Sequence, residues 1–219
     1  MGTMVKIWDL PTRIFHWSLV LLFIFMIISG ESDDLLEWHF YAGYLMSGLI
    51  LFRVLWWFLG TRYARFSALK LSPMELMSYS KDLLRSKHTP SYGHTPPGSM
   101  MVVLVLVLLT IQLLTGMMST DDIIWNGPFY NYVSGDTSEL SGQVHEVIQL
   151  ILQILVGIHV LAIILYKVKF KEALVPAMVH GKKTEQGDEP AREDMSLVKL
   201  LIAALPSAGL TYWLFSLPI

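Results

Sequence analysis

The chain has 219 residues, of which 53 % are hydrophobic and only 16 % are charged, and its formal net charge is −2. A soluble domain of this length would carry more charge. There is no cysteine, which excludes thiolate ligands, disulfides, iron–sulfur clusters and covalent haem attachment. Composition therefore predicts an all-α integral membrane protein whose surroundings are lipid, and we expect no nucleic-acid partner.

The apolar residues are gathered in five blocks, each close to the ~20 residues that a membrane-spanning helix needs. The blocks are residues 14–29, 38–60, 100–118, 147–166 and 198–217. The first block lacks a small-residue cleavage site and contains a histidine and a tryptophan, so we interpret it as a retained helix and not as a signal peptide. The fifth contains Pro206 near its middle, which makes it the least regular of the five.

These blocks predict a four-helix transmembrane domain over residues 1–180 and an additional C-terminal transmembrane helix over residues 197–219. Residues 181–196 (GKKTEQGDEPAREDMS) separate the two, and this stretch has no core-forming residues. We therefore expect it to be a solvated, charged linker.

Charge differs between the loops on the two sides of the predicted membrane. The connections at 31–37 and roughly 119–145 contain acidic residues and no lysine or arginine. The acidic residues of these two connections are Glu31, Asp33, Asp34, Glu37, Asp121, Asp122, Asp136 and Glu139. Lysine and arginine gather in the segments on the other side. The positive-inside rule then predicts a multi-pass membrane protein whose N-terminus and charged linker lie on the inner side and whose C-terminus lies on the outer side.

Two histidines of the fourth block, His145 and His159, are fourteen residues apart. A helix turns ~100° and rises ~1.5 Å per residue, so these side chains share one face about 21 Å apart. His16 lies near the inner end of the first block and His39 near the outer end of the second. The four histidines therefore form two levels, His16 with His159 and His39 with His145.

An ionisable ring inside a bilayer is costly and usually functional. A haem iron takes two axial imidazoles, which different helices of a bundle can supply. We therefore predict two non-covalent b haems, with His16 and His159 as ligands to one iron and His39 and His145 to the other. Histidines that only hydrogen-bond between helices are the alternative, as is a di-metal site, which would need its ligands close together.

Three further residues are candidates for contacts with haem. Gly30 follows His16 by fourteen residues and would leave space for the outer porphyrin, while Arg53 follows His39 by fourteen and would pair with a haem propionate. Chance would also produce such offsets. Arg13, three residues before His16, would pair with an inner propionate or extend toward the inner surface as a lysine or arginine at a helix end commonly does.

Several segments together resemble the bacterial cytochrome b561 family, in the branch with the b-type cytochrome subunit of membrane nickel–iron hydrogenases. They are WDLPTRIFHW (8–17), YGHTPPGSMM (92–101), STDDIIWNGPFY (119–130) and HEVIQLILQILVGIH (145–159), followed by YKVKFKEALVPAMVHGKK. The resemblance covers about residues 5–183. It implies a four-helix core, two b haems bound by His16, His39, His145 and His159, and electron exchange with quinone. GHTPPG departs from the family's G-H-N-P-x-G at Thr95, which leaves the role of His94 open.

These observations predict a di-haem cytochrome of electron transport that carries electrons between the quinone pool of a respiratory chain and a periplasmic redox partner. Two alternatives remain: an anchor subunit of a hydrogenase-like complex, and an enzyme that oxidises superoxide with quinone. A surface of one charge sign attracts the opposite sign. The acidic outer loops would repel superoxide, so we expect a basic c-type cytochrome or a redox enzyme subunit as the partner.

Overall fold

The computed structural model describes residues 4–87, 91–121, 123–184 and 194–218. Five of its helices are long and apolar enough to cross a membrane, which confirms the all-α integral membrane fold. They are α1 (Leu10–Gly30), α2 (Leu36–Leu59), α4 (Pro96–Met118), α5 (Gly135–Lys169) and α7 (Leu197–Phe215). Aspartate at the N-cap and proline in the first turn begin α1, and threonine followed by proline begins α4 in the same way. Both patterns suit the free N–H groups of a helix start.

Helix α5 begins twelve residues earlier than its apolar block, inside the expected outer loop 119–145. The hydroxyl of Ser134 accepts a hydrogen bond from the backbone N–H of Thr137 and caps the helix at its start. Hydropathy detects only the part of a helix that lies in lipid, so the polar first turns of α5 were missed. With 35 residues, α5 is longer than a bilayer core requires.

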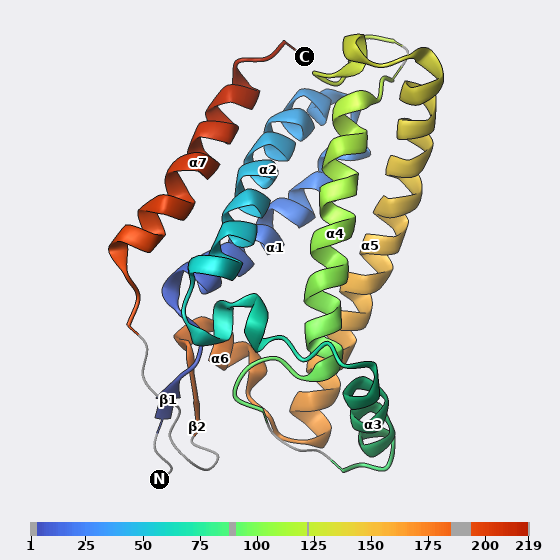
Figure 1. Cartoon of the computed structure of the whole chain (residues 1–219). Helices are drawn as coiled ribbons and strands as arrows, with labels where there is room; N and C mark the ends of the chain where they lie inside the picture. The colour runs from blue at the N-terminus through green and yellow to red at the C-terminus, as the bar shows by residue number, and fades with distance from the viewer. Residues whose placement is uncertain (1–3, 88–90, 122, 185–193, 219) are drawn as a thin grey trace.

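The helices form two pairs, α1 with α2 and α4 with α5, and the pairs meet through α2 and α4 (Figure 1). A core of buried apolar side chains fills the middle of this four-helix bundle. Its members are Phe15, Met46, Ile50, Leu106, Leu109, Ile148 and Leu152. A pocket lies between the two pairs, and Met46, Leu109 and Leu152 of this core are among its lining residues.

Helix α7 lies outside the bundle and packs along α2. Ala203, Ser207 and Thr211 recur every four residues on one face of α7, and a Cβ atom on Gly48 of α2 would overlap the hydroxyl of Thr211. Small residues let two helix backbones approach closely, which is how helices associate in lipid. Pro206 lies inside α7 without ending it.

Short segments close the end of the bundle that carries the N-terminus. Strand β1 (Met4–Lys6) pairs antiparallel with β2 (Lys182–Thr184). The short helices η2 (Arg62–Ala64), η3 (Phe66–Ala68), α3 (Pro73–Leu84) and α6 (Leu174–His180) also lie at this end, whereas η1 (Asp33–Leu35) and η4 (Tyr130–Tyr132) lie in the connections at the opposite end. The expected linker 181–196 thus begins with a strand bound to the N-terminal segment, and its residues 185–193 lie outside the described part.

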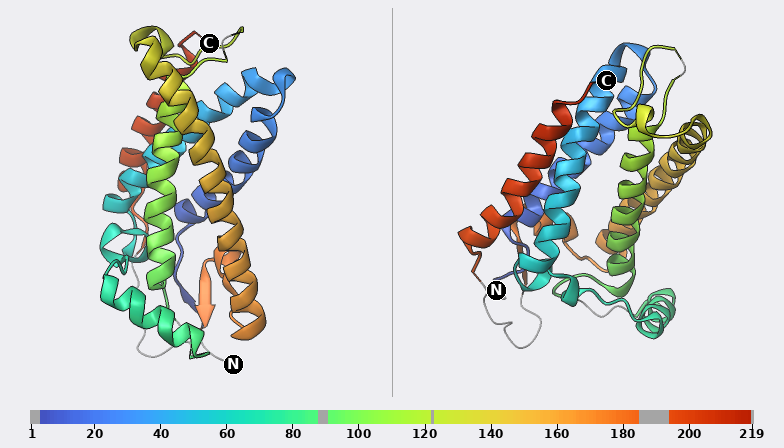
Figure 2. Two further views of the ribbon diagram at one scale, coloured as in Figure 1. Left: turned by 90° about the vertical axis from the view of Figure 1, so that its right-hand side faces the viewer. Right: turned by 45° about the horizontal axis from the view of Figure 1, so that its top comes forward.

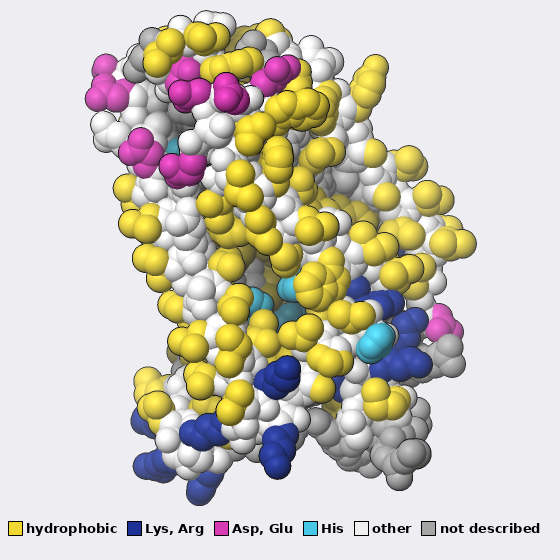
Figure 3. Space-filling view, turned by 180° about the vertical axis from the view of Figure 1, so that it is seen from behind, with side chains coloured by type: hydrophobic (Ala, Val, Ile, Leu, Met, Phe, Trp, Pro, Cys, Tyr) yellow, Lys and Arg dark blue, Asp and Glu magenta, His cyan; other side chains and the backbone are white. Residues whose placement is uncertain are grey.

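Opposite charges mark the two ends of the molecule, and the sides between them are apolar (Figure 3). The acidic end consists of the α1–α2 and α4–α5 connections with Glu31, Asp33, Asp34, Glu37, Asp121, Asp136 and Glu139; Asp122 lies outside the described residues. The basic end consists of the N-terminal segment, the α2–α4 connection and the segment after α5. Its cations are Lys6, Arg13, Arg62, Arg65, Lys70, Lys81, Arg85, Lys87, Lys167, Lys169, Lys171, Lys182 and Lys183.

Candidate functional site

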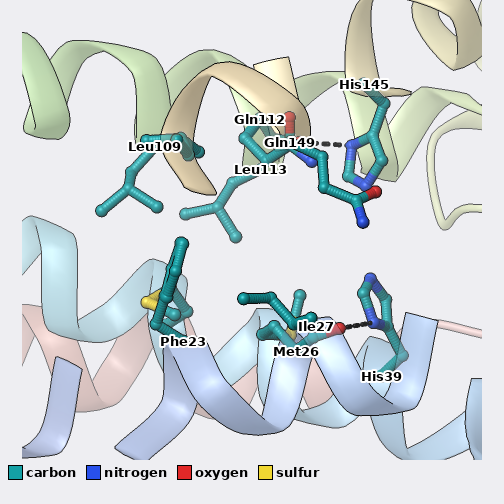
Figure 4. Close-up of a pocket in the computed structure, with 11 residues that line it drawn as sticks. Phe23, Met26, Ile27, His39, Leu109, Gln112, Leu113, His145 and Gln149 are labelled. Carbon is teal, nitrogen blue, oxygen red and sulfur yellow. Dashed lines mark hydrogen bonds between the residues drawn. The ribbon is translucent and has the colours of Figure 1, made fainter. Parts of the chain in front are cut away.

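His39 and His145 face each other across a pocket between the two helix pairs, near the acidic end (Figure 4). His39 comes from the first turns of α2 and His145 from α5, and their ring centroids are 6.3 Å apart at an interplanar angle of 70°. A metal–imidazole bond is about 2 Å long, so an ion between two facing imidazoles separates the ring centroids by roughly 6 Å. The gap would therefore suit one metal ion held between His39 and His145.

The Nδ1 atom of His39 is held by the neighbouring helix α1. It lies 3.1 Å from the carbonyl oxygen of Met26 and 3.2 Å from the hydroxyl oxygen of Ser29. The Ser29 hydroxyl in turn lies 2.8 Å from the carbonyl of Phe25, to which it donates. Ser29 is fully buried, so this support is shielded from solvent.

Helix α4 holds His145 in the same way. Its Nδ1 atom lies 2.9 Å from the carbonyl oxygen of Gln112 and 3.4 Å from the hydroxyl oxygen of Thr115. The Thr115 hydroxyl donates to the carbonyl of Ile111 at 2.8 Å. Each histidine thus contacts a carbonyl at one position of the adjacent helix and a hydroxyl three residues later.

Glycine follows the hydroxyl residue in both helices. A Cβ atom on Gly116 would lie 2.7 Å from Cε1 and 3.0 Å from Nδ1 of His145, and one on Gly30 would lie 3.2 Å from Cε1 and 3.3 Å from Nδ1 of His39. The Ser29–Gly30 and Thr115–Gly116 pairs therefore form two equivalent cradles, one for each ring. Gly30, expected to leave space for a porphyrin, lies beside the imidazole that would bind it.

These contacts fix the protonation of both rings. A carbonyl oxygen can only accept, so Nδ1 of each histidine carries the proton and donates it. The Nε2 atom then has a free lone pair, which is the form that binds a metal. Histidine ligands commonly donate their other ring N–H to a backbone carbonyl, which sets the ring orientation and raises its basicity. The pair is therefore pre-arranged for ligation.

Apolar side chains from both pairs of helices line the pocket. Its lining residues are Phe23, Met26, Ile27, His39, Met46, Leu109, Gln112, Leu113, His145, Gln149 and Leu152. Gln149 donates to the carboxylate of Glu31 at 3.2 Å and so connects α5 to the end of α1. The Oε1 atom of Gln112 is buried and has no hydrogen-bond partner among the described residues, which leaves one acceptor at the pocket wall.

His16 of α1 and His159 of α5 form the second level, nearer the basic end. They lie close enough for their charges to interact. Nδ1 of His16 is buried, and no described residue hydrogen-bonds to it. His159 is solvent-accessible in the protein alone, and histidines are visible in a hollow of the surface above the basic end (Figure 3). The second pair is thus brought together but is less enclosed than the first.

The model of the family described as prokaryotic cytochrome b561 matches residues 7–181. This match covers the whole four-helix bundle with all four histidines, and it ends before α7. The chain belongs to the prokaryotic cytochrome b561 family. No curated protein and no solved structure matched the chain. The match confirms the predicted family but does not extend to the hydrogenase branch. The protein is accordingly a multi-pass membrane b-type cytochrome that binds b-type haem and transfers electrons.

Arg53 of this cytochrome b561 is 3 % exposed at the basic end of α2. Its Nη1 donates to the carbonyl of Ala64 at 3.0 Å, and its guanidinium lies 5.8 Å from the Phe15 ring centroid and 5.4 Å from that of Trp57. The carboxylate of Asp9 interacts with it electrostatically. Arg53 therefore has partners within the protein, and its predicted contact with a propionate stays a prediction.

Arg13 of the cytochrome donates to the carbonyl of Val179, so it joins the start of α1 to the end of α6. Its Nε atom is buried and makes no hydrogen bond to a described residue, although it lies beside Gly181. A buried donor of this kind suits an anionic group. The residues therefore fit a carboxylate at this end, and the contact of Arg13 with a haem propionate stays a prediction.

His94, in the segment before α4, packs edge-on against Trp8 with ring centroids 4.7 Å apart. Burial, together with the positive charges of Arg53 and Lys183, lowers the pKa of His94 to about 3. His94 is therefore neutral, and it contacts the N-terminal segment of the cytochrome. The substitution at Thr95 does not disturb the helix start, because Thr95 caps α4.

Sequence reasoning located the histidines but missed the residues that hold them. Ser29, Thr115 and Gly116 were not singled out, although each cradle is a hydroxyl residue followed by glycine at the same depth. Asp9 was also missed: it is 4 % exposed and accepts hydrogen bonds from the Thr12 backbone, the Trp56 indole and the Thr61 hydroxyl. The Asp-x-Pro helix start was its signal.

Proposed function

We propose that this protein is a di-haem b-type cytochrome of the bacterial inner membrane that carries electrons between the quinone pool and a periplasmic redox partner. His39 and His145 would hold one haem, and His16 and His159 the other. The observation that carries the proposal is the first pair, whose rings face each other at 6.3 Å with both Nδ1 atoms bound to carbonyl oxygens. Bound haem supplies one-electron chemistry at iron.

The chain itself contributes ligation, spacing and exclusion of water. The cradles of α1 and α4 keep Nε2 of His39 and His145 unprotonated and aimed into the pocket. Leu152, midway along α5 between His145 and His159, belongs to the apolar core of the bundle. This core therefore separates the two haem sites with low-dielectric material and keeps water and ions from crossing between them.

The charge distribution supports the orientation proposed here. The basic end, with Arg62 and Lys167 among its cations, would face the cytoplasm, and the acidic end would face the periplasm. The N-terminus is then cytoplasmic and the C-terminus, after α7, periplasmic. In this orientation His39 and His145 lie on the periplasmic side of the bilayer.

The acidic end also favours one partner class over the alternatives. Exposed carboxylates on the α1–α2 connection, such as Asp33 and Asp34, lie near the pocket of His39. Charge of one sign raises the encounter rate with an oppositely charged partner. A basic c-type cytochrome or basic redox subunit is therefore favoured. An anchor role in a hydrogenase-like complex is compatible with the same surface, whereas superoxide, an anion, would be repelled.

Haem content and pairing test this function. The pyridine haemochrome of the purified protein should give two haems per chain. His39→Ala and His145→Ala should remove the same spectral component in a redox titration, and His16→Ala and His159→Ala the other. The exposed His180 offers a matched control, and its alanine variant should keep both haems. One haem per chain, or a shared loss by the His16 and His39 variants, would contradict the proposal.

The partner requires a separate experiment, because Asp121 is not a simple surface charge. Its carboxylate accepts hydrogen bonds from the backbone N–H groups of Ile123, Ile124 and Trp125 at 2.8–3.0 Å and so organises the loop. Asp33→Asn with Asp34→Asn changes charge alone. We expect this double variant to react more slowly with a basic c-type cytochrome in stopped-flow experiments, with a flatter salt dependence.

A double variant at the opposite end, Glu75→Gln with Asp82→Asn, is the matched control and should react as the parent does. Haem content should be unchanged in both double variants. A rate that is indifferent to salt and to the Asp33 and Asp34 substitutions would remove the basic-partner proposal while leaving the di-haem proposal intact.

A further inference from the structure

Helix α3 (Pro73–Leu84) lies at the basic end and runs crosswise to the spanning helices α4 and α5 (Figure 2). The Ser72 hydroxyl caps its start by accepting from the backbone N–H of Glu75. Ser86, at φ 60°, ends it with a left-handed residue. It is thus a defined amphipathic helix in the long α2–α4 connection.

One face of α3 packs on the protein. Leu76, Tyr79 and Leu83 are half-buried, and α3 contacts α4. The Tyr79 hydroxyl lies 3.0 Å from the hydroxyl of Tyr166 in α5. These contacts account for the apolar residues on this side of the helix.

A second apolar stripe points away from the protein. Met74, Met77 and Leu84 are 81 %, 59 % and 85 % exposed. At ~100° per residue these three side chains fall within about 80° of each other, on the face opposite Leu76, Tyr79 and Leu83. Exposed apolar stripes on a capped helix mark an interaction surface, and here the surface continues the lipid-facing sides of the bundle.

The positively and negatively charged side chains of α3 lie on different sides of the helix. Lys81 falls inside the exposed stripe and Arg85 falls at its border, whereas Glu75 and Asp82 point roughly 100° or more away from the centre of the stripe. All four are solvent-exposed. The stripe therefore combines apolar side chains with positive charge only, and long cationic side chains can extend from an apolar surface to reach an anionic group.

The hydrogen bond between the hydroxyls of Tyr79 and Tyr166 fixes where the exposed apolar stripe of α3 lies relative to the membrane. Tyr166 lies in the last turns of α5, directly before the cations Lys167 and Lys169. Tyrosine and lysine at the end of a spanning helix lie at the level of the lipid headgroups. Helix α3 is therefore held at the membrane surface, where its exposed stripe meets the boundary between headgroups and acyl chains.

We propose that α3 is a membrane-surface anchor for anionic phospholipid. Met74, Met77 and Leu84 insert at the acyl boundary, while Lys81 and Arg85 bind headgroup phosphates. The anchor holds the α2–α4 connection against the bilayer. It depends only on the protein being embedded in a membrane and not on haem number or electron partner.

The absence of cysteine from the chain allows single labelling sites in the full-length, haem-loaded cytochrome. Spin labels at Met77→Cys and Leu84→Cys would report on the stripe, and a label at Asp82→Cys on the opposite charge face. In vesicles of phosphatidylcholine with phosphatidylglycerol, the stripe labels should relax more with oxygen than with a water-soluble nickel chelate, and the Asp82 label should do the reverse. Stripe labels that respond like the Asp82 label, or that are protected from both reagents by protein, would overturn the anchor.

A second comparison tests lipid charge. A cation near an anionic leaflet strengthens surface binding by about fivefold, so phosphatidylglycerol should raise the oxygen preference of the Met77 label above that in phosphatidylcholine alone. Lys81→Gln with Arg85→Gln should abolish this increase. Glu75→Gln with Asp82→Asn, the matched control, should retain it. An increase that survives the loss of both cations, or no increase in the parent, would overturn the binding of anionic lipid.

Discussion

Substituting Gly116 by alanine tests the cradle of His145 directly. The new Cβ atom would lie 2.7 Å from Cε1 and 3.0 Å from Nδ1 of His145, whereas unstrained carbon–carbon contacts are about 3.5–4.0 Å. The ring must therefore withdraw by about 1 Å. That movement stretches the 2.9 Å contact of Nδ1 with the Gln112 carbonyl and disturbs the 6.3 Å separation from His39.

Loss of a supporting contact of this kind costs about 10–100-fold in metal affinity. This corresponds to about 1.4–2.8 kcal/mol of binding free energy. Gly30→Ala should have a smaller effect in the same direction, because its Cβ would lie 3.2 Å from Cε1 of His39. In both variants alanine replaces a glycine in a helix, which favours the helical backbone by up to about 1 kcal/mol. We therefore expect the variants to lose haem but to keep the fold.

Haem per chain by pyridine haemochrome and a redox titration of the purified protein would measure the effect. The component lost from Gly116→Ala should be the one lost from His39→Ala and His145→Ala. Gly209→Ala is the control, since a Cβ there meets nothing within 4 Å. Full haem content with unchanged potentials in Gly116→Ala would refute the cradle reasoning.

Three further predictions concern the surroundings of the site. Gly48→Leu should separate α7 from α2 through overlap with Thr211, lowering stability by about 1–3 kcal/mol in thermal unfolding while haem content stays at the parent value. Gly181→Ala should lower the melting temperature, because Gly181 has φ 77° and its Cβ would lie 2.5 Å from the carbonyl oxygen of Trp8; an unchanged melting temperature would contradict this. Burial raises the pKa of Asp121, but hydrogen bonds from backbone N–H groups outweigh it and give a net pKa below the usual value. Because the folded pKa is lowered, the ionised Asp121 stabilises the loop at pH values above the unfolded pKa of about 3.9, and this stabilisation is lost as pH falls through the folded pKa. The protection of residues 123–127 against hydrogen exchange, measured relative to the intrinsic exchange rate at each pH, should therefore fall in acid, and protection independent of acid pH would argue against it.

The sequence alone determined the features that depend on local pattern and on the bilayer. Spanning helices need about 20 apolar residues, so five blocks were enough to predict α1, α2, α4, α5 and α7, including α7 with Pro206 inside it. Helical periodicity places His145 and His159 on one face, and alternation of spans places His16 and His39 at the matching depths. The distribution of charge predicts which ends are acidic and basic.

Only the tertiary structure decided what surrounds those histidines. Whether the Met26 and Gln112 carbonyls accept from the imidazoles depends on how α1 packs on α2 and α4 on α5, and no local pattern specifies this packing. The same holds for the pairing of residues 182–184 with the N-terminal segment and for the contact of Gly48 with α7. Hydropathy measures partition into lipid, which is nearly the same for any apolar face. Close approach of backbones, by contrast, depends on small residues that meet only after the helices have assembled.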